Sequence, residues 1–180
     1  MKSTIPPWKV YWSPLTVRGE DWARGKAVST FDLYLDDFEQ LDESMSMRTL
    51  AYRMLILALS PAFSRIDDRP VLRDAVDRSI DEFFAWFCKA EKKLILDTTG
   101  QDGEIIDGVG RLLNIGHSIK TSWFIMEEAM ARGDRDLALR TAPLIEWNLN
   151  RGWDGSLGGL LLLTDIDGGP HPRPEWDMKF

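Results

Sequence analysis

The sequence predicts an all-α fold made of helical hairpins, with short β-hairpins between the helical units. Apolar residues recur at helical spacing in four segments, which follow one another as two pairs: about 45–60 with 70–91, and 116–132 with 136–150. Each pair is followed by a short apolar run and a Gly/Asp-rich turn. The LILD that begins at Leu94 and the LLTD that begins at Leu162 lie about 68 positions apart, which indicates a repeated unit.

The first helical pair is defined by its apolar positions and its prolines. The segment MSMRTLAYRMLILALSPAF places apolar residues on one side of a helix that ends near Pro61. Asp68-Arg69-Pro70 predicts the start of the second helix, because proline is favoured in a first helical turn. We expect this helix to reach about Glu91. The following KLILDTTGQDGEIID predicts two short strands around a Gly/Asp-rich reversal.

The second pair repeats this order. A helix is expected from about Gly116 to Arg132, and the turn RGDRD follows, with Asp134 as the N-cap of the next helix. That helix is expected from about Asp136 to Asn150. The segment GGLLLLTDIDGGPHP then predicts another apolar strand and a Gly/Asp turn. Such hairpin units cannot bury their apolar faces alone, so they are expected to stack on one another.

Composition excludes several classes of protein. The net charge is −7 and no block of Lys or Arg occurs, so we expect neither a nucleic-acid partner nor an anionic membrane surface. Cys88 is the only cysteine, which excludes an internal disulfide, and its apolar setting EFFAWFCKA predicts an inert buried thiol. No apolar signal segment and no membrane-spanning stretch are present, so the cytoplasm is the expected location.

His117, one of only two histidines, follows a glycine at the start of an apolar helix. Two interpretations stay open from the residues alone: a structural helix-start residue, or a proton-transfer group. Arg111 and Asn114 in GRLLN have the same ambiguity, because Arg111 is suited to an ion pair and Asn114 to capping the helix. Trp123 and Phe124 fit core packing. Trp153 and Asp154 are expected to lock a turn, and TDIDGG lacks the ligand spacing of a calcium loop.

The segment GRLLNIGHSIKTSWFIMEEA, followed by RGWDGSLGGLLLLTDIDGGP and EWDMKF, resembles the N-acylglucosamine 2-epimerase family, also known for renin-binding protein. ESMSMRTLAYRMLILAL, residues 43–59, is similar to an earlier helix of that family. The resemblance implies a partial (α/α)6 toroid, a ring of helical hairpins whose central hole is a sugar site. We therefore expect an irregular N-terminal segment over residues 1–42, with residues 31–41 as a short helix or an extended arm, and a partial epimerase-like toroid over 43–180.

The resemblance also implies an activity. The family interconverts sugars by moving a proton at C2 of the open chain, so the expected partner is a small-molecule sugar: N-acylglucosamine, N-acylmannosamine or a related aldose. His117 is implied as the catalytic base, because an imidazole takes up a proton near neutral pH without a metal or an organic cofactor. Lys120, one helical turn further on, stands where the family carries Glu, and it is implied as the second catalytic residue. Arg111, Asn114 and Trp123 are implied to bind the substrate.

The family's second proton-transfer histidine lies beyond Phe180, and His171 is expected in a solvent-exposed loop. Since losing one of two proton-transfer groups costs about 10²–10⁴-fold in rate, we expect a truncated epimerase that is weakly active or inactive alone. About two helical units are present, whereas a ring of six would need about 400 residues. The alternative is a non-catalytic remnant, a protein interaction module that forms a homodimer through its open helical faces.

Overall fold

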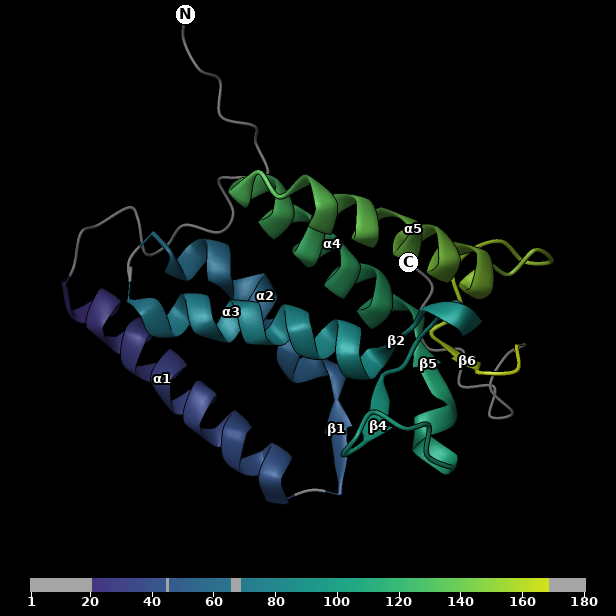
Figure 1. Ribbon diagram of the computed structural model, residues 1–180, viewed down its shortest axis with the longest axis horizontal. Helices are drawn as coiled ribbons and strands as arrows, with labels where there is room; N and C mark the ends of the chain where they lie inside the picture. The colour runs from purple at the N-terminus through teal and green to yellow at the C-terminus, as the bar shows by residue number, and fades with distance from the viewer. Residues whose placement is uncertain (1–20, 45, 66–68, 169–180) are drawn as a thin grey trace, which may run out of the picture.

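The computed structural model describes residues 21–44, 46–65 and 69–168, without the side chains of residues 21–23 and 36–44. This part is mainly helical, as predicted: α1 (Asp21–Ser44), α2 (Leu50–Phe63), α3 (Pro70–Glu82), α4 (Ile115–Arg132) and α5 (Arg135–Gly152). Helix α2 packs against α3 and α4, and α4 packs against α5. Figure 1 shows the α4–α5 pair along one side of α2 and α3, and α1 along the other.

The strands are short and form three separate two-stranded antiparallel sheets. β1 (Met47–Thr49) pairs with β4 (Thr98–Gly100), β2 (Cys88–Lys89) with β3 (Leu94–Ile95), and β5 (Leu112–Asn114) with β6 (Leu163–Asp165). The strand before each helical pair therefore bonds to the strand that follows it. The expectation of two strands paired around the Gly/Asp-rich reversal is wrong. β3 and β4 both lie before the reversal; β4 pairs with β1, which precedes α2, and β3 pairs with β2, which follows α3.

The repeat is confirmed, but its period is 65 residues and not 68. β1 and β5, α2 and α4, α3 and α5, and β4 and β6 each begin 65 positions apart. We call residues 47–100 the first unit and residues 112–165 the second unit. The LILD and LLTD runs therefore do not occupy the same structural position, since in the second unit the apolar run continues three residues further before its aspartate.

The helix boundaries follow local chemistry at most ends. Pro70 occupies the first turn of α3, and Asp134 caps α5 by accepting a hydrogen bond from the amide of Leu137 at 2.9 Å, both as predicted. Gly133 ends α4 with a φ of 69°, a conformation that glycine adopts without strain. Pro61 does not end α2, which continues to Phe63.

The second helix of the first unit is shorter than expected, since α3 ends at Glu82 and not near Glu91. Its continuation, Phe83–Phe87, is wound as a π-helix, and a 3-10 turn follows at Ala90–Lys92. Phe83 and Phe87 are both fully buried. Residues four positions apart share one face of such a turn, so both phenylalanines lie on the side that faces the core. A further 3-10 turn, Gly108–Arg111, leads into β5.

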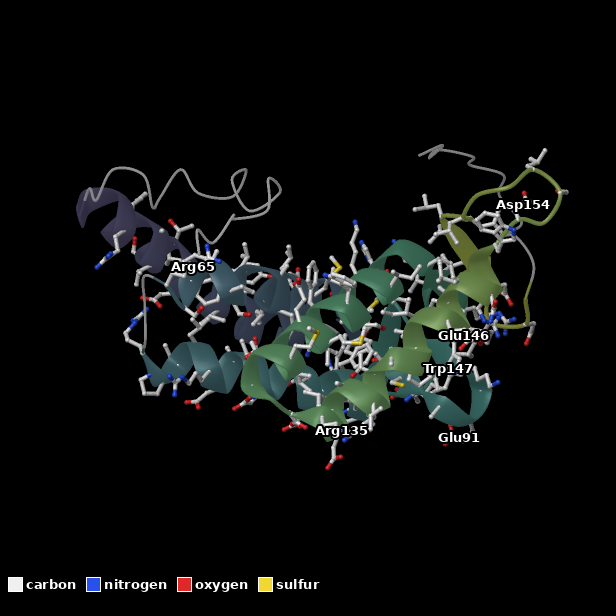
Figure 2. All side chains as sticks on the ribbon, turned by 90° about the horizontal axis from the view of Figure 1, so that it is seen from above. Arg65, Glu91, Arg135, Glu146, Trp147 and Asp154 are labelled. Carbon is white, nitrogen blue, oxygen red and sulfur yellow. The ribbon has the colours of Figure 1, made fainter. Side chains whose placement is uncertain are left out.

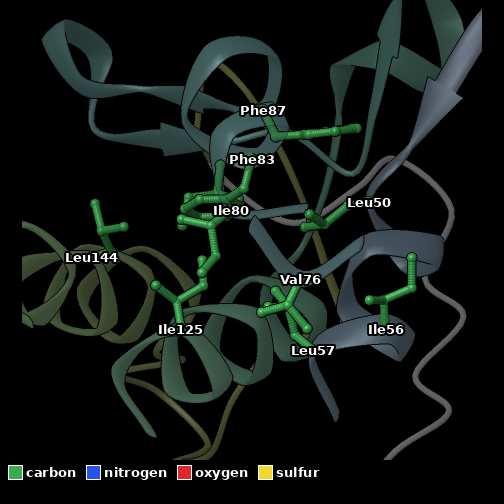
Figure 3. Packing of buried hydrophobic residues seen from close by; sticks show 10 residues of the cluster. Leu50, Ile56, Leu57, Val76, Ile80, Phe83, Phe87, Ile125 and Leu144 are labelled. Atoms are coloured by element: carbon green, nitrogen blue, oxygen red, sulfur yellow. The ribbon is translucent and has the colours of Figure 1, made fainter. Parts of the chain in front are cut away.

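One hydrophobic core joins the two units. Its buried residues come from α2, α3, the π-helix, β3, α4 and α5: Leu50, Ile56, Leu57, Val76, Ile80, Phe83, Phe87, Ile95, Ile125 and Leu144. Figure 3 shows Ile125 of α4 and Leu144 of α5 beside Ile80 and Phe83. A smaller cluster of Leu94, Leu96, Leu113 and Ile115 lies where the strands meet the start of α4. Removing these side chains from water is what holds the units together.

Residues 21–44 correct the expectation of an irregular segment over 1–42, because they form the helix α1. Phe31 is buried and stacks on Phe63 of α2 with ring centroids 4.4 Å apart. Asp32 forms an ion pair with Arg69, and the hydroxyl of Tyr34 donates to the carbonyl of Tyr52. Burial raises the pKa of Tyr34 to about 12. These contacts hold a weakly amphipathic helix against α2; residues 1–20 lie outside the described part.

Candidate functional site

His117 lies in the first turn of α4. The side chain of Asn114 caps this helix, since its Oδ1 accepts a hydrogen bond from the backbone amide of His117 at 3.0 Å. The neighbouring Ile115 and Ser118 are buried, and the carbonyl of His117 accepts a hydrogen bond from Thr121. The imidazole is therefore mounted on a well-anchored helix start, with 29 % of its side chain exposed.

The side chain of Asp97 contacts His117, and sequence reasoning missed it. Oδ1 of Asp97 lies 2.7 Å from Nδ1 of the imidazole. Asp97 sits between β3 and β4, and its backbone carbonyl accepts a hydrogen bond from the amide of Leu50 at 2.9 Å. The one available signal was an acidic residue directly after the buried run Leu94–Leu96, at the turn into the next strand.

The pair determines which ring nitrogen is available for chemistry. An ionised carboxylate only accepts hydrogen bonds, so Nδ1 is the donor in this contact. In the neutral imidazole the lone pair then lies on Nε2, the atom that accepts a proton. This is the arrangement in which a carboxylate orients a histidine base. With 28 % of the Asp97 side chain and 29 % of the His117 side chain exposed, the pair is accessible from outside.

Lys120 and Trp123 continue along α4 from His117. Each follows the previous residue by three positions, a spacing that places neighbours on adjoining parts of one helix surface. Lys120 is exposed and has no ion-pair partner in the part of the chain that the structure describes. Trp123 is 52 % exposed, which corrects the expectation that it packs in the core, whereas Phe124 does pack against the core cluster.

Arg111 and Asn114 adopt their structural alternatives. The Arg111 guanidinium lies 2.7 Å from Asp165 and 2.6 Å from Asp167, and these hydrogen bonds, that of Asp167 first, raise the pKa of Arg111. Since Asp165 belongs to β6, this arginine fastens the second unit's two strands together. Asn114 is occupied through its Oδ1 as the cap of α4. Their predicted contacts with a substrate stay predictions.

The turn after α5 is locked as expected. Oδ1 of Asp154 accepts hydrogen bonds from the amide and hydroxyl of Ser156 and from the amide of Leu157. These bonds, that of the Ser156 hydroxyl first, lower the pKa of Asp154. Trp153 bridges to Leu160, and Gly158 and Gly159 have φ values of 72° and 106°. Figure 2 shows Asp154 on the loop beyond the end of α5.

The described residues also bear on metal binding, membrane insertion and cysteine reactivity. Residues 21–44, 46–65 and 69–168 contain no group of three His, Cys, Asp or Glu residues placed to hold a metal ion, and none of their helices is long and apolar enough to cross a membrane. Burial raises the pKa of Cys88, as expected for an unreactive thiol. His171, Asp177 and Lys179 lie outside the described residues.

A recess of about 420 Å³ lies beside the C-terminal half of α5 and is lined by Lys93, Glu146, Trp147, Asn150, Arg151 and Gly168. Figure 2 shows Glu146 and Trp147 at the same end of the molecule as Glu91. Its lining contains neither His117 nor Lys120, and Arg151 is partly engaged by the carbonyls of Asp165 and Ile166. The recess adds no residue to the His117 site.

Comparison with known sequences confirms the resemblance to the N-acylglucosamine 2-epimerase family. The chain is 25 % identical to N-acylglucosamine 2-epimerase of Mus musculus over 145 residues, which is 78 % of this chain and 34 % of the mouse protein. It is 34 % identical to the enzyme of Bos taurus over 88 residues, 48 % of this chain and 21 % of the bovine protein. The chain thus spans between about a fifth and a third of these relatives. No family profile matches it.

Among solved structures, cellobiose 2-epimerases are similar in fold. The enzyme of Spirochaeta thermophila DSM 6192 matches with a TM-score of 0.55 at 23 % identity, over 72 % of this chain and 32 % of that one. The enzyme of Bacillus thermoamylovorans B4167 matches with a TM-score of 0.55 at 19 % identity, over 65 % and 30 % of the two chains. The described helices therefore adopt an arrangement found in part of these proteins.

Proposed function

We propose that this chain carries the proton-abstracting half of a carbohydrate 2-epimerase site, with His117 as the base at C2 of an open-chain aldose. The observation that carries this proposal is the 2.7 Å contact between Asp97 and Nδ1 of His117, which leaves Nε2 of the neutral ring as the proton acceptor. The relatedness in sequence to N-acylglucosamine 2-epimerases supports a sugar as the substrate.

The step needs no group other than the base and the aldehyde. Nε2 of His117 takes the proton from C2, the C2–H electron pair forms a C1–C2 double bond, and the carbonyl pair moves onto the C1 oxygen, giving an enolate. Asp97 stabilises the imidazolium that forms, because its carboxylate already lies on Nδ1. Return of a proton to the opposite face of C2 inverts the centre, and return to the same face restores the starting sugar.

We also propose that the two units belong to a closed ring of six helical hairpins. At 65 residues a unit, such a ring needs about 390 residues. In that arrangement α2 and α4 would be inner helices and α3 and α5 outer ones. The start of α4, with His117 on it, would then open toward the hollow of the ring, and activity would depend on hairpins beyond the two described.

Isotope exchange tests the proposal better than net epimerisation, because a single base suffices for exchange. N-acetylmannosamine is incubated with the protein in D₂O, and deuterium at C2 and the appearance of the epimer are followed by NMR. We expect exchange at C2 to exceed epimerisation, since His117 alone returns the deuteron to the face it came from. His117→Gln is expected to lower the exchange rate by about 10²-fold or more.

Asp97→Asn should lower the exchange rate about 10- to 100-fold, because an amide no longer stabilises the imidazolium, and should shift the pH profile. Asp107→Asn is the matched control, since this exposed aspartate makes no side-chain capping bond. Exchange that is equally fast in wild type and His117→Gln would show that His117 is not the base.

A second candidate is an interaction module that dimerises through open helical faces. The exposed Trp123 and Met130 on α4, 52 % and 75 % exposed, favour it. Sedimentation analysis of wild type and Trp123→Ala distinguishes the two: a dimer that dissociates on this substitution, with no exchange at C2, supports the module.

A further inference from the structure

We infer that the site around His117 selects an aldose that carries a carboxylate, and that Lys120 binds this group. The inference rests on the proposed function and names the class of substrate for the same site. Lys120 follows His117 by three positions on α4, so the two side chains extend from neighbouring parts of one helix surface. A sugar bound at His117 can therefore reach the ammonium group of Lys120.

The distances agree with a six-carbon sugar acid. Side chains three positions apart on a helix have Cβ atoms about 5–6 Å apart. Four carbon–carbon bonds of about 1.5 Å in a staggered chain place C6 about 5 Å from C2. A hexuronate whose C2 lies against His117 therefore carries its carboxylate to the next turn of α4, within reach of the flexible ammonium of Lys120.

The protein as a whole is acidic, with a net charge of −7, but the charges around Lys120 favour an anion at this place. Lys120 has no acidic partner among the described residues, and the first turn of α4 contains no acidic side chain. Asp97, the carboxylate next to His117, is already bound to the imidazole. The partial positive charge of the helix start adds to that of Lys120.

Trp123 supplies the apolar side of this surface. Its indole is half-exposed, three positions beyond Lys120 on the same helix. An indole face packs against the C–H groups of a sugar and leaves its hydroxyls in water. Imidazole, ammonium and indole thus follow one another at intervals of three residues along α4, and the indole lies next to the position proposed for the carboxylate end of the sugar.

Binding is tested by NMR titration at low salt, with the Trp123 indole N–H as the probe. D-glucuronate and D-glucose are the ligands, and the Trp123→Phe variant assigns the signal. We expect glucuronate to reach half-saturation at about fivefold lower concentration than glucose, which is the upper range for a solvent-accessible ion pair. Lys120→Gln should remove this preference and Lys120→Glu should reverse it. Lys26→Gln, an exposed lysine on α1, should leave it unchanged.

The inference is overturned if the preference for glucuronate survives in Lys120→Gln, if glucose binds as tightly in the wild-type protein, if neither sugar binds, or if binding leaves the Trp123 signal in place. Exchange at C2, measured on the same samples, separates this from the proposed function. His117-dependent exchange that is equally fast with both sugars overturns the selection by Lys120 alone. A Lys120-dependent preference without any exchange at C2 overturns the reaction.

Discussion

The first and second units have the same backbone plan but different chemistry. The two helices of the second unit, and its first and last strands, begin 65 positions after their counterparts in the first unit. The π-helix that ends at Phe87 corresponds to the last turn of α5, which ends at Gly152. The β-pairing at the end of each helical pair agrees as well: Cys88 pairs with Ile95 in the first unit, and Trp153 pairs with Leu160 in the second. The two units therefore share their backbone plan and differ in their side chains.

The candidate site arises from one such difference. The first residue of α2 and the first residue of α4 each donate their amide to a carbonyl just before the returning strand: Leu50 to Asp97, and Ile115 to Leu162. In the first unit the residue with this carbonyl also carries a carboxylate, and that carboxylate binds His117 of the second unit. Leu162 offers no such group. The site thus lies at the junction of the units, built by a residue that the fold already holds in place.

The largest expected difference concerns the fourth residue of α2 and the fourth residue of α4. Arg53 and Ser118 are both fully buried, and both donate to the carbonyl four residues earlier, of Thr49 and Asn114. Arg53 also binds Glu82 at 2.7 Å. Arg53→Ala leaves Glu82 with less charge compensation in a nearly buried place, so we expect a loss of about 3 kcal/mol in the free energy of unfolding.

Ser118→Ala is the matched substitution in the second unit, with an expected loss of about 1 kcal/mol. Urea denaturation followed by far-UV circular dichroism measures both. Equal losses would mean that the ion pair of the first unit adds no stability beyond the shared hydrogen bond.

The N-terminal caps of α2 and α4 have the next largest expected effect. Asn114 caps α4 through its side chain, whereas Thr49 precedes α2 without a side-chain capping bond. Asn114→Ala should lower the free energy of unfolding by about 1 kcal/mol, and Thr49→Ala by a few tenths, about 0.3 kcal/mol. The amide of His117 should at the same time lose protection from hydrogen exchange. A larger loss from Thr49→Ala than from Asn114→Ala contradicts the assignment.

The equivalent buried threonines Thr99 and Thr164 of the returning strands β4 and β6 predict opposite signs for the change in stability. The Thr99 hydroxyl donates to the carbonyl of Gly100, while the Thr164 hydroxyl is buried with no hydrogen-bond partner in the part of the chain described. Thr164→Val removes an unsatisfied hydroxyl and should raise the free energy of unfolding by about 0.5–1 kcal/mol, and Thr99→Val should lower it by about 0.5 kcal/mol. Thermal denaturation of the two variants gives the signs; a destabilised Thr164→Val would reveal a partner for that hydroxyl.

The smallest effect is local to the turn at Asp154 and depends on pH. Because the pKa of Asp154 is lowered, its hydrogen bonds are fully present above the usual range for a carboxyl and are lost as the pH falls through the lowered value. The amide shifts of Ser156 and Leu157 should follow that titration. Ser156→Ala should bring the pKa of Asp154 back toward its ordinary value. A wild-type carboxyl that titrates in the ordinary range would contradict the bonds of this turn.

Local signals in the sequence predicted the parts that local chemistry controls. Pro70, Asp134 and the segment around His117 mark helix starts within a few residues, and the helices found there begin as expected. The helix α1 was predicted only in part, as one of two alternatives for residues 31–41, because acidic residues interrupt its apolar pattern and its contacts are with residues distant in the sequence, such as Phe63 and Arg69. The period was misjudged because the two apolar runs, which contain β3 and β6, do not lie at equivalent positions of the two units.

The site was predicted only in its histidine. Asp97 and His117 are 20 positions apart and belong to different units, so no spacing rule of a helix or strand joins them. Arg111 was given two alternatives, an ion pair or a sugar contact; the ion pair is present, but its partners are two aspartates more than fifty positions away that the sequence did not identify. Long-range partners of this kind become visible only when the chain is folded.

The pairing of the first and last strands of each unit has a consequence for how such a protein changes over evolutionary time. Since Met47 lies opposite Gly100, and Leu112 opposite Asp165, the chain leaves each unit beside the point where it arrived, about 5 Å away. A duplicated stretch of gene that encodes one unit would therefore splice into the connection between two others without threading through them. Growth by whole hairpins is geometrically simple in this architecture.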